Sequence, residues 1–497
     1  MHIEKEHIVV VWLKRDLRLQ DNEALYKALN SGKRVLLLYV FEHLLINDPH
    51  YSERHFNFIK ESIRDINHRL SAYNTKVLAV TSDVQNCFNH LQDFYKIDTI
   101  YSHQETGLLV TFNRDKEFKR YCRNNIILWD ESINNGVRRG LKDREAWFED
   151  WNDYMSKDQF LFQPQSHQFL NHEDIAKLET VLTPTDLSTP EDSRFQKGGT
   201  TEAYEYANSF LQTRYKNYMF NISKPQASRS SCSRLSPYIS WGNVSVREIY
   251  QKGKQTKGNQ ANNRHISAFL SRLRWQAHFI QKFEMEHIME EASVNKGYHK
   301  LKKRISEAYQ KAWKEGNTGF PLVDASMRCL NQTGYLNFRM RALLVSFFTH
   351  ILWQPWQDAT THLSQQFLDF EPGIHFPQLQ MQAGETGINN LRIYNPIKNG
   401  IEHDPDATFI REWVPELSHL ELAYIHQPHL MTQLEQELYD FKIGIDYPHP
   451  IVDIQENRKK ASDILWKMKD DPEVRKESQR ILKKHTISDR NRMLRDS

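Results

Sequence analysis

Short apolar runs that alternate with amphipathic helical segments constrain the fold of the first 135 residues more than any other feature. The runs are rich in β-branched residues or leucine, and they lie at residues 8–13, 35–41, 77–80, 98–102 and 126–129. Between them, residues 54–70 place apolar side chains on one helical face: Phe58, Ile59, Ile63 and Ile66. This alternation predicts an α/β domain with a doubly wound parallel sheet over residues 1–135. No glycine-rich dinucleotide motif follows the first run, so a dinucleotide site is not expected there.

The chain changes character twice after this domain. Residues 136–200 are polar, and the residues that break helices and strands there are Pro164, Pro184, Pro190, Gly198 and Gly199. A segment of this kind is typical of a linker between domains. Over residues 201–497 helical periodicity dominates, which predicts an all-α second domain. After Asn457 the chain has 13 Lys/Arg against 7 Asp/Glu, so we expect a short basic C-terminal tail, most simply a solvated helix.

Composition excludes several kinds of site and location. The net charge of +3 gives no overall basic bias, so a nucleic-acid partner must be recognised from local patches. The cysteines are scattered and include no CxxC pair: Cys87, Cys122, Cys232 and Cys329. Disulfides and a metal site are therefore not expected, and the thiols suit a reducing cytoplasm. No apolar run approaches the ~18 residues of a membrane span, and the start does not suit a signal peptide, so we expect a cytoplasmic protein.

One later stretch has the composition of a pocket wall. Residues 316–417 interleave Arg, Asp, Asn and aromatic residues within helical apolar spacing. Buried polar groups are tolerated only when they find partners, so this mixture favours a cofactor or nucleic-acid pocket. The stretch begins with GNTGFPLVDASMRCLNQTGYLNFRMRALLVSFF (316–348) and ends with AGETGINNLRIYNPIKNGIEHDPDATFIREWVPEL (383–417).

Together with three other motifs, this stretch resembles the cryptochrome/photolyase family. The other motifs are VVWLKRDLRLQDNEAL (10–25), WGNVSVREIY (241–250) and YPHPIVD (447–453). The resemblance extends from about residue 8 to about residue 455 and is closest to an atypical, bacterial-type member. It implies a photolyase-like antenna domain followed by an all-helical FAD-binding domain.

The resemblance implies an FAD site whose chemistry these residues can supply. Residues 228–245 are rich in serine and run into a helical pattern that begins with proline, which suits a pyrophosphate, although a plain loop is the alternative. Arg341 and Asp369 match the family's ion pair beside the flavin ring, where a guanidinium favours negative charge; an ordinary salt bridge is the alternative. The residues expected to contact FAD are Tyr218, Cys232, Ser233, Arg234, Leu235, Ser236, Phe269, Arg272, Phe338, Arg341, Asp369, Glu371 and His375.

Several of these positions depart from the family pattern. Cys232 replaces a hydroxyl residue, Glu371 replaces a second Asp, and Phe338 replaces an Asn. His375 falls where the family places Asn or Asp against flavin N5, and a plain surface or core histidine is the alternative interpretation. The expected catalytic residues are Trp275, Arg341, Asp369 and His375.

The resemblance also implies a DNA-binding face. Trp275 falls on the tryptophan that stacks against a flipped pyrimidine dimer, as repair inside a duplex requires. Arg272, however, replaces a Glu that hydrogen-bonds the damaged base, and Asn337 replaces the catalytic His of (6-4) photolyases. The expected DNA-binding residues are Trp275, Arg339, Met381 and Arg392.

The family's three-tryptophan path for electrons is interrupted here. Its positions read Leu379, Trp356 and Lys303, so Trp356 alone remains, with Trp353 as either a substitute carrier or a core residue. In the first domain, Val110 and Thr111 replace the Asn–Glu pair that binds a folate antenna, which leaves the second chromophore open.

The leading hypothesis is a photolyase-like lyase in which reduced FAD, excited by blue light, transfers an electron to a pyrimidine dimer in UV-damaged DNA. The altered base-facing residues and the interrupted tryptophan path favour the alternative of a cryptochrome-like photoreceptor without repair. A light-independent nucleic-acid-binding flavoprotein is a third hypothesis. We expect a monomer.

Overall fold

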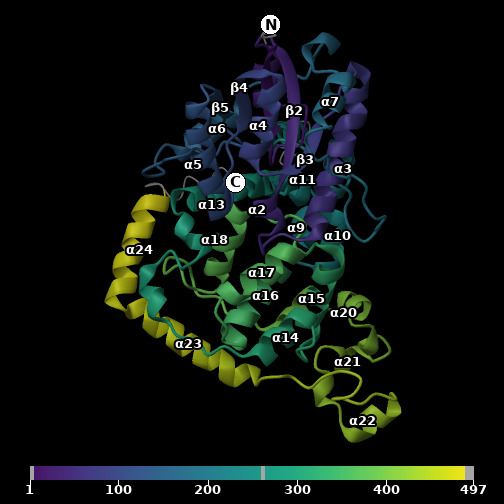
Figure 1. Ribbon diagram of the computed structural model, residues 1–497. Helices are drawn as coiled ribbons and strands as arrows, with labels where there is room; N and C mark the ends of the chain where they lie inside the picture. The colour runs from purple at the N-terminus through teal and green to yellow at the C-terminus, as the bar shows by residue number, and fades with distance from the viewer. Residues whose placement is uncertain (1–4, 259–263, 487–497) are drawn as a thin grey trace.

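The computed structural model describes residues 5–258 and 264–486, and it consists of a parallel sheet domain followed by a helical domain (Figure 1). The sheet order is β3-β2-β1-β4-β5, and each neighbouring pair is parallel. The strands are β1 (His7–Leu13), β2 (Arg34–Glu42), β3 (Leu78–Ser82), β4 (Lys96–His103) and β5 (Leu128–Ser132). The predicted doubly wound fold is therefore confirmed.

Helices α1 to α5 connect the parallel strands, and α6 and α7 follow the last strand. They are α1 (Glu23–Leu29), α2 (His43–Ile46), α3 (Glu53–Leu70), α4 (Val84–Phe94), α5 (Leu109–Asn124), α6 (Trp147–Ser156) and α7 (His172–Leu178). The sheet is buried on both faces because alternate residues of β1 contribute to two separate apolar clusters, Val9 and Val11 to one and Ile8 and Val10 to the other.

Two details differ from the sequence prediction. The fifth strand begins at Leu128 instead of residue 126, because Ile126 has a left-handed backbone (φ +55°) and is exposed where the chain leaves α5. The linker over residues 136–200 is also less open than its composition suggests. Its helix α6 buries Trp147 and Trp151 in the main apolar cluster, so this segment adds to the core.

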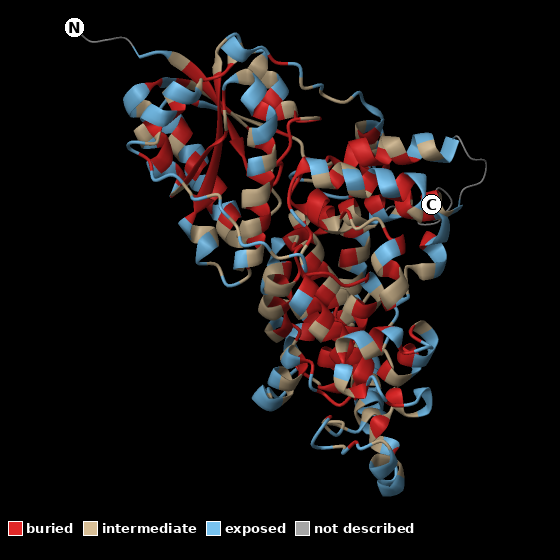
Figure 2. Cartoon of the chain, turned by 90° about the vertical axis from the view of Figure 1, so that its right-hand side faces the viewer, coloured by how far each residue is buried: buried red, intermediate tan, exposed pale blue. Residues whose placement is uncertain are grey.

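Helices make up the rest of the described chain (Figure 1), and buried residues run through the middle of both domains (Figure 2). These helices are α8 (Thr200–Gln212), α9 (Tyr218–Asn221), α10 (Pro225–Ser231), α11 (Ser236–Ser240), α12 (Val246–Gly258), α13 (Arg264–Met285), α14 (Glu307–Glu315), α15 (Pro321–Thr333), α16 (Phe338–Ser346), α17 (Gln357–Gln366), α18 (Pro372–Gln382), α19 (Pro396–His403), α20 (Thr408–Trp413), α21 (Leu422–Ile425), α22 (Gln433–Leu438), α23 (Ile454–Asp470) and α24 (Pro472–His485). Within the described residues, no helix combines the length and apolar character that crossing a membrane requires. The end of the predicted basic tail, residues 487–497, lies outside the described residues.

The segment that follows β1 joins the two domains. Arg15 donates from Nε to the Ser240 carbonyl at 3.2 Å, and its guanidinium carbon lies 4.5 Å from the centre of the Trp241 ring. Arg18 donates to the Gly242 carbonyl at 3.2 Å. Gly242 has φ +76°, and a Cβ atom there would lie 2.3 Å from the Arg15 carbonyl oxygen. The domains therefore meet backbone against backbone at a position that only glycine fits.

We expect Gly242→Ala to destabilise the protein more than Gly32→Ala. Gly32 has a similar φ of +73° but nothing within 4 Å of an added Cβ, so both variants carry about 1–2 kcal/mol of left-handed strain. Only Gly242→Ala also forces two backbones apart, which adds about 1–3 kcal/mol. Urea unfolding of both variants measures the difference, and equal losses would contradict the close approach.

Candidate functional site

Arg341 and Asp369 form a two-pronged ion pair at the centre of the expected flavin site. Arg341 on α16 donates from Nη1 to Oδ1 of Asp369 at 3.0 Å and from Nη2 to Oδ2 at 2.8 Å. Its Nε donates to the Leu336 carbonyl at 2.7 Å, and Phe367 lies under the guanidinium with 4.0 Å between carbon and ring centre. The side chain of Arg341 is 27% exposed although Met340 and Ala342 beside it are buried. A fixed, partly open guanidinium can hold an anionic ring edge.

The backbone around Asp369 is fixed by the turn that the first domain contacts. Ser240 donates from its hydroxyl to the Asp369 carbonyl at 3.1 Å, and the Trp241 indole donates to the Leu368 carbonyl at 2.9 Å. Glu371 faces the other way, because its Oε2 lies 3.8 Å from Nε of Arg15. Burial raises the pKa of the Glu371 carboxyl. Glu371 therefore joins the domains instead of extending the Arg341–Asp369 pair.

His375 lies on α18 and is held as a neutral imidazole. Its Nε2 donates to the carbonyl of Thr360 at 3.0 Å, which leaves Nδ1 as an acceptor. Burial lowers the pKa of His375 to about 3, with a smaller contribution from His50. Arg341 and Asp369 make smaller contributions of opposite sign to the pKa of His375. A neutral acceptor there can take a hydrogen bond from a ring N–H.

The predicted phosphate loop lies between α10 and α11, and two arginines hold its shape, Arg214 from outside the loop and Arg234 from within it. Arg214 donates to the carbonyl oxygens of Cys232 and Ser233, the latter at 3.3 Å. Arg234 has a left-handed backbone (φ +60°), and its guanidinium carbon lies 3.7 Å from the Tyr335 ring centre. Helix α11 begins at Ser236, after Leu235, and no side chain of the described residues caps it. Pro237 has no N–H, so the N–H groups that can face an anion there are those of Ser236 and Tyr238.

Aromatic residues from α9 and α13 form a wall beside this loop. Phe269 lies edge-on to Tyr218 with 6.1 Å between ring centres and 4.8 Å from Phe210. Burial raises the pKa of the Tyr218 hydroxyl, and Arg272 opposes that shift. An uncapped helix start, an aromatic wall and a partly open Arg–Asp pair are the parts that a dinucleotide with a flavin ring needs. The residues present therefore fit FAD.

The residues expected to contact DNA are surface residues of the helical domain. Trp275 on α13 is 37% exposed, and Arg392 is exposed in the loop before α19. Arg339 is half-buried beside Tyr394, with 3.5 Å from its Nη1 to the hydroxyl. Met381 is also half-buried. Phe338, expected at the flavin, is 51% exposed at the start of α16, which suits a pocket rim better than a pocket floor.

The positions of the interrupted tryptophan path lie in a packed core. Trp356 is fully buried at the start of α17, one helical turn before Thr360, whose carbonyl binds His375. Leu379 is buried on α18. Trp353 has a left-handed backbone (φ +54°), and Nζ of Lys303 lies 4.8 Å from its ring centre. A cation at that distance opposes positive charge on the Trp353 ring.

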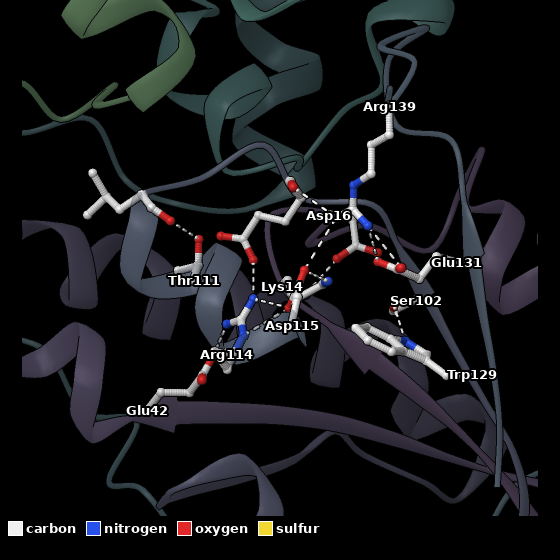
Figure 3. A network of polar contacts seen from close by, with 12 residues as sticks. Lys14, Asp16, Glu42, Ser102, Thr111, Arg114, Asp115, Trp129, Glu131 and Arg139 are labelled. Carbon is white, nitrogen blue, oxygen red and sulfur yellow. Dashed lines mark hydrogen bonds and ion pairs between the residues drawn. The ribbon is translucent and has the colours of Figure 1, made fainter. Parts of the chain in front are cut away.

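In the first domain, charged side chains fill the carboxyl ends of the strands (Figure 3). Arg114 on α5 pairs with Asp115 at 2.9 Å, with Glu105 at 2.7 Å and with Glu42 at the end of β2. The Lys14 ammonium lies 4.0 Å from Asp115. This edge, where β1 and β4 lead to opposite halves of the sheet, is the usual ligand position in such folds. Here the positive and negative side chains at this edge form ion pairs with one another.

Val110 and Thr111 lie on α5 near this network. Thr111 is buried, and its hydroxyl donates to the Leu108 carbonyl at 2.9 Å (Figure 3). Neither residue supplies the carboxylate or amide that the family's folate site uses. The structure gives no reason to change the open prediction for a second chromophore.

The sequence interpretation missed residues that hold the site from a distance. Arg15 lies within the first motif, residues 10–25. Charged residues directly after a buried strand could have indicated that this segment contacts another part of the chain. Gln196 lies in the linker, and its Oε1 accepts from Nε and Nη2 of Arg234 at 3.1 and 2.9 Å. No sequence pattern marks Gln196, because it contributes through a contact between segments far apart in the chain.

The network in Figure 3 predicts a specific pH dependence. Burial, with Glu105 and Asp115 nearby, raises the pKa of Glu42 from 4.5 to about 7 although Arg114 opposes the shift. Because the folded protein disfavours ionised Glu42, the stabilising contribution is complete below pH 4.5 and is lost as the pH rises through about 7. We expect the unfolding free energy to fall by about 2–3 kcal/mol over this range, relative to Glu42→Gln. A constant difference between the two proteins from urea unfolding would contradict this expectation.

Two family models match the chain. One, described as the FAD binding domain of DNA photolyase, matches residues 269–467, and the other, described as DNA photolyase, matches residues 9–132. A deoxyribodipyrimidine photo-lyase of Alkalihalophilus pseudofirmus is 25% identical over 485 residues, covering 92% of this chain and 97% of that protein. A cryptochrome DASH of Synechocystis is 26% identical over 474 residues, covering 90% and 96%.

Solved structures show the same fold. A Synechocystis cryptochrome superposes with a TM-score of 0.81 at 22% identity, covering 93% of this chain and 99% of that one. A bacterial class III photolyase from Agrobacterium tumefaciens gives 0.80 at 23% identity, covering 94% and 98%. With both family models in chain order and these relatives along almost its whole length, the chain belongs to the cryptochrome/photolyase family, and its helical domain is an FAD-binding domain.

Proposed function

We propose that this protein is an FAD-dependent, blue-light-driven photolyase that acts on pyrimidine dimers in UV-damaged DNA. The observation that carries the proposal is the exposure of Trp275 on α13, the helix that also supplies Phe269 and Arg272 to the flavin site. Its exposed indole offers a face on which a flipped base can stack. The curated photo-lyase relatives agree with this choice.

The residues have separate tasks in this proposal. Bound FAD supplies a one-electron donor that blue light excites. Arg341 holds negative charge at the ring, and Asp369 keeps the guanidinium in place. Trp275 stacks the flipped base, while Arg392 neutralises backbone phosphate.

A cryptochrome-like photoreceptor is the second candidate, and Arg272 favours it. This residue stands where the repair enzymes that the sequence resembles place an acceptor for the damaged base. Its guanidinium can only donate hydrogen bonds, whereas the usual carboxylate accepts them. Relatives named cryptochrome occur beside those named photo-lyase.

The cofactor assignment predicts that Asp369→Asn weakens FAD retention. Arg341 would lose its charge partner in a site that is only partly solvated, so we expect a loss of about 2–3 kcal/mol in FAD binding, below the value for a fully buried pair. The matched control is Glu416→Gln, which breaks the Arg328–Glu416 pair away from this site (2.7 Å, with a similarly exposed arginine and a more exposed carboxylate). Equal flavin content in both purified variants would contradict the assignment.

The function is tested with a duplex oligonucleotide that carries one defined pyrimidine dimer. We expect blue light to split the dimer and restore its two pyrimidines in the presence of the wild-type protein, and Trp275→Ala to remove the preference for damaged over undamaged duplex by about 1–3 kcal/mol. Arg392→Ala should weaken binding to both duplexes and reduce the salt slope by about one.

Matched controls separate these effects from general surface changes. Trp466 on α23 is 54% exposed, and Arg123 at the end of α5 is exposed, so Trp466→Ala and Arg123→Ala remove similar side chains elsewhere. Both control variants should bind and repair as the wild type does. Lesion-independent binding without any light-dependent repair would favour the photoreceptor candidate.

A further inference from the structure

A hydrogen-bonded chain leads from Trp356 to a buried carboxylate. The Trp356 indole donates from Nε1 to Oγ of Ser293 at 3.0 Å, and the Ser293 hydroxyl donates to Oε2 of Glu385 at 2.7 Å. Both directions are fixed, because an indole N–H only donates and a carboxylate only accepts. All three residues are at least nine-tenths buried. The chain is therefore oriented for a proton to move away from the indole.

Lys303 balances the negative charge of Glu385, the last residue of this hydrogen-bonded chain. Its ammonium donates to Oε1 of Glu385 at 3.2 Å and to the Thr349 carbonyl at 3.2 Å. Burial lowers the pKa of Lys303, and Glu385 opposes that change. The same ammonium lies 4.8 Å from the Trp353 ring centre, which disfavours positive charge on that ring. A positive charge formed on Trp356 is therefore discouraged from moving on to Trp353.

The polar pair opens onto a cavity of about 240 Å³. Its lining includes Ser293, Lys303, Glu385 and Tyr298. The Tyr298 hydroxyl is buried and has no hydrogen-bond partner among the described residues, and burial together with Glu385 raises its pKa to about 12. A polar space of this size can hold water, so a proton that reaches the carboxylate has an onward route.

The loop that carries Ser293 is fixed to the helix that carries the flavin-site histidine. Gln380 on α18 accepts from the Val294 N–H at 2.8 Å and donates to the carbonyls of Met289 and Ala292 at 2.8 and 3.1 Å. His375 lies on the same helix, just over one turn earlier. The positions of Ser293 and the flavin site are therefore coupled through one rigid element.

We propose that Ser293 and Glu385 form a proton relay for Trp356, an inference that rests on the light-driven flavin chemistry of the proposed function. Bound FAD would supply a light-excited one-electron acceptor, and loss of one electron, which the cofactor would keep, would leave Trp356 as a radical cation. The Nε1–H bond of the indole breaks, its proton passes to Oγ of Ser293, and the Ser293 proton passes to Oε2 of Glu385. The products are a neutral indolyl radical and a neutral carboxyl group, with Lys303 still charged.

This relay compensates for the interrupted tryptophan path. With Leu379 and Lys303 in place of the flanking tryptophans, charge on Trp356 cannot separate further by hopping along that path. Loss of the proton makes return of the electron slower, because the neutral radical is a weaker oxidant than the radical cation. Proton transfer from Trp356 thus slows charge recombination, which is what additional tryptophans do in an uninterrupted path.

The test is blue-light flash spectroscopy of the full chain loaded with FAD, in which cationic and neutral tryptophan radicals absorb differently. In the wild type we expect the cationic signal to convert into the neutral one. Ser293→Ala should slow that conversion at least about tenfold, and Ser293→Thr, which keeps the hydroxyl, should restore it. Trp356→Phe should remove both signals.

Matched variants separate the relay from loss of packing. Ser326→Ala removes an equally buried hydroxyl that bonds only the Leu322 carbonyl, and Trp313→Phe removes a buried indole that bonds only the Leu344 carbonyl. Both should leave the radical kinetics unchanged. Glu385→Gln combined with Lys303→Met keeps the site neutral and should reproduce the slow conversion of Ser293→Ala. Thermal unfolding of the flavin-free proteins checks that each variant is folded.

The outcomes distinguish the relay from the function on which it rests. Equal conversion rates in the wild type and Ser293→Ala overturn the relay alone, and so does a radical signal that survives Trp356→Phe. A wild-type protein that forms no tryptophan radical overturns the relay together with light-driven flavin chemistry. Radical formation and conversion as expected, without repair of dimer DNA, support the relay and count against the photolyase proposal.

Discussion

The rest of the structure depends on the contact between the segment after β1 and the turn after α11. Arg15 and Arg18 use their donors on carbonyl groups of that turn, and Gly242 lets the two backbones approach to a distance that any side chain would prevent. The same turn donates to the carbonyls of Leu368 and Asp369. The first domain therefore positions the backbone of the flavin site through one intermediate layer, although it contributes few side chains to that site.

Two carboxylates in one short segment serve two different arginines, and this division explains how the segment stays rigid. Asp369 pairs with Arg341 within the helical domain, whereas Glu371 pairs with Arg15 across the domain boundary. Buried ion pairs contribute little net stability, because desolvation offsets their attraction. Their value is geometric: each pair permits one arrangement of its backbone. A cofactor that needs a charged group at a fixed position benefits from that restriction more than from added stability.

The fold and the central ion pair could be predicted from sequence, whereas contacts between distant segments could not. Apolar periodicity located all strands to within a few residues, and the motif around Arg341 placed its pairing with Asp369. The family resemblance predicted that Glu371 contacts the flavin together with Asp369. Its partner Arg15 lies 356 positions away in the sequence, and only the folded chain brings the two residues together. Helix α6 was hidden for a related reason, since its buried tryptophans lie within a polar, proline-rich linker whose average composition masks them.

The replacement of a tryptophan by Lys303 changes more than the path for electrons. An ammonium in a buried position requires a counter-charge, and Glu385 supplies it at 3.2 Å. A carboxylate with a second oxygen to satisfy then takes the Ser293 hydroxyl, which in turn takes the Trp356 indole. Each polar group is thus required by the one before it, from the buried lysine to the tryptophan. Charge balance at a buried site is sufficient to explain why these residues occur together.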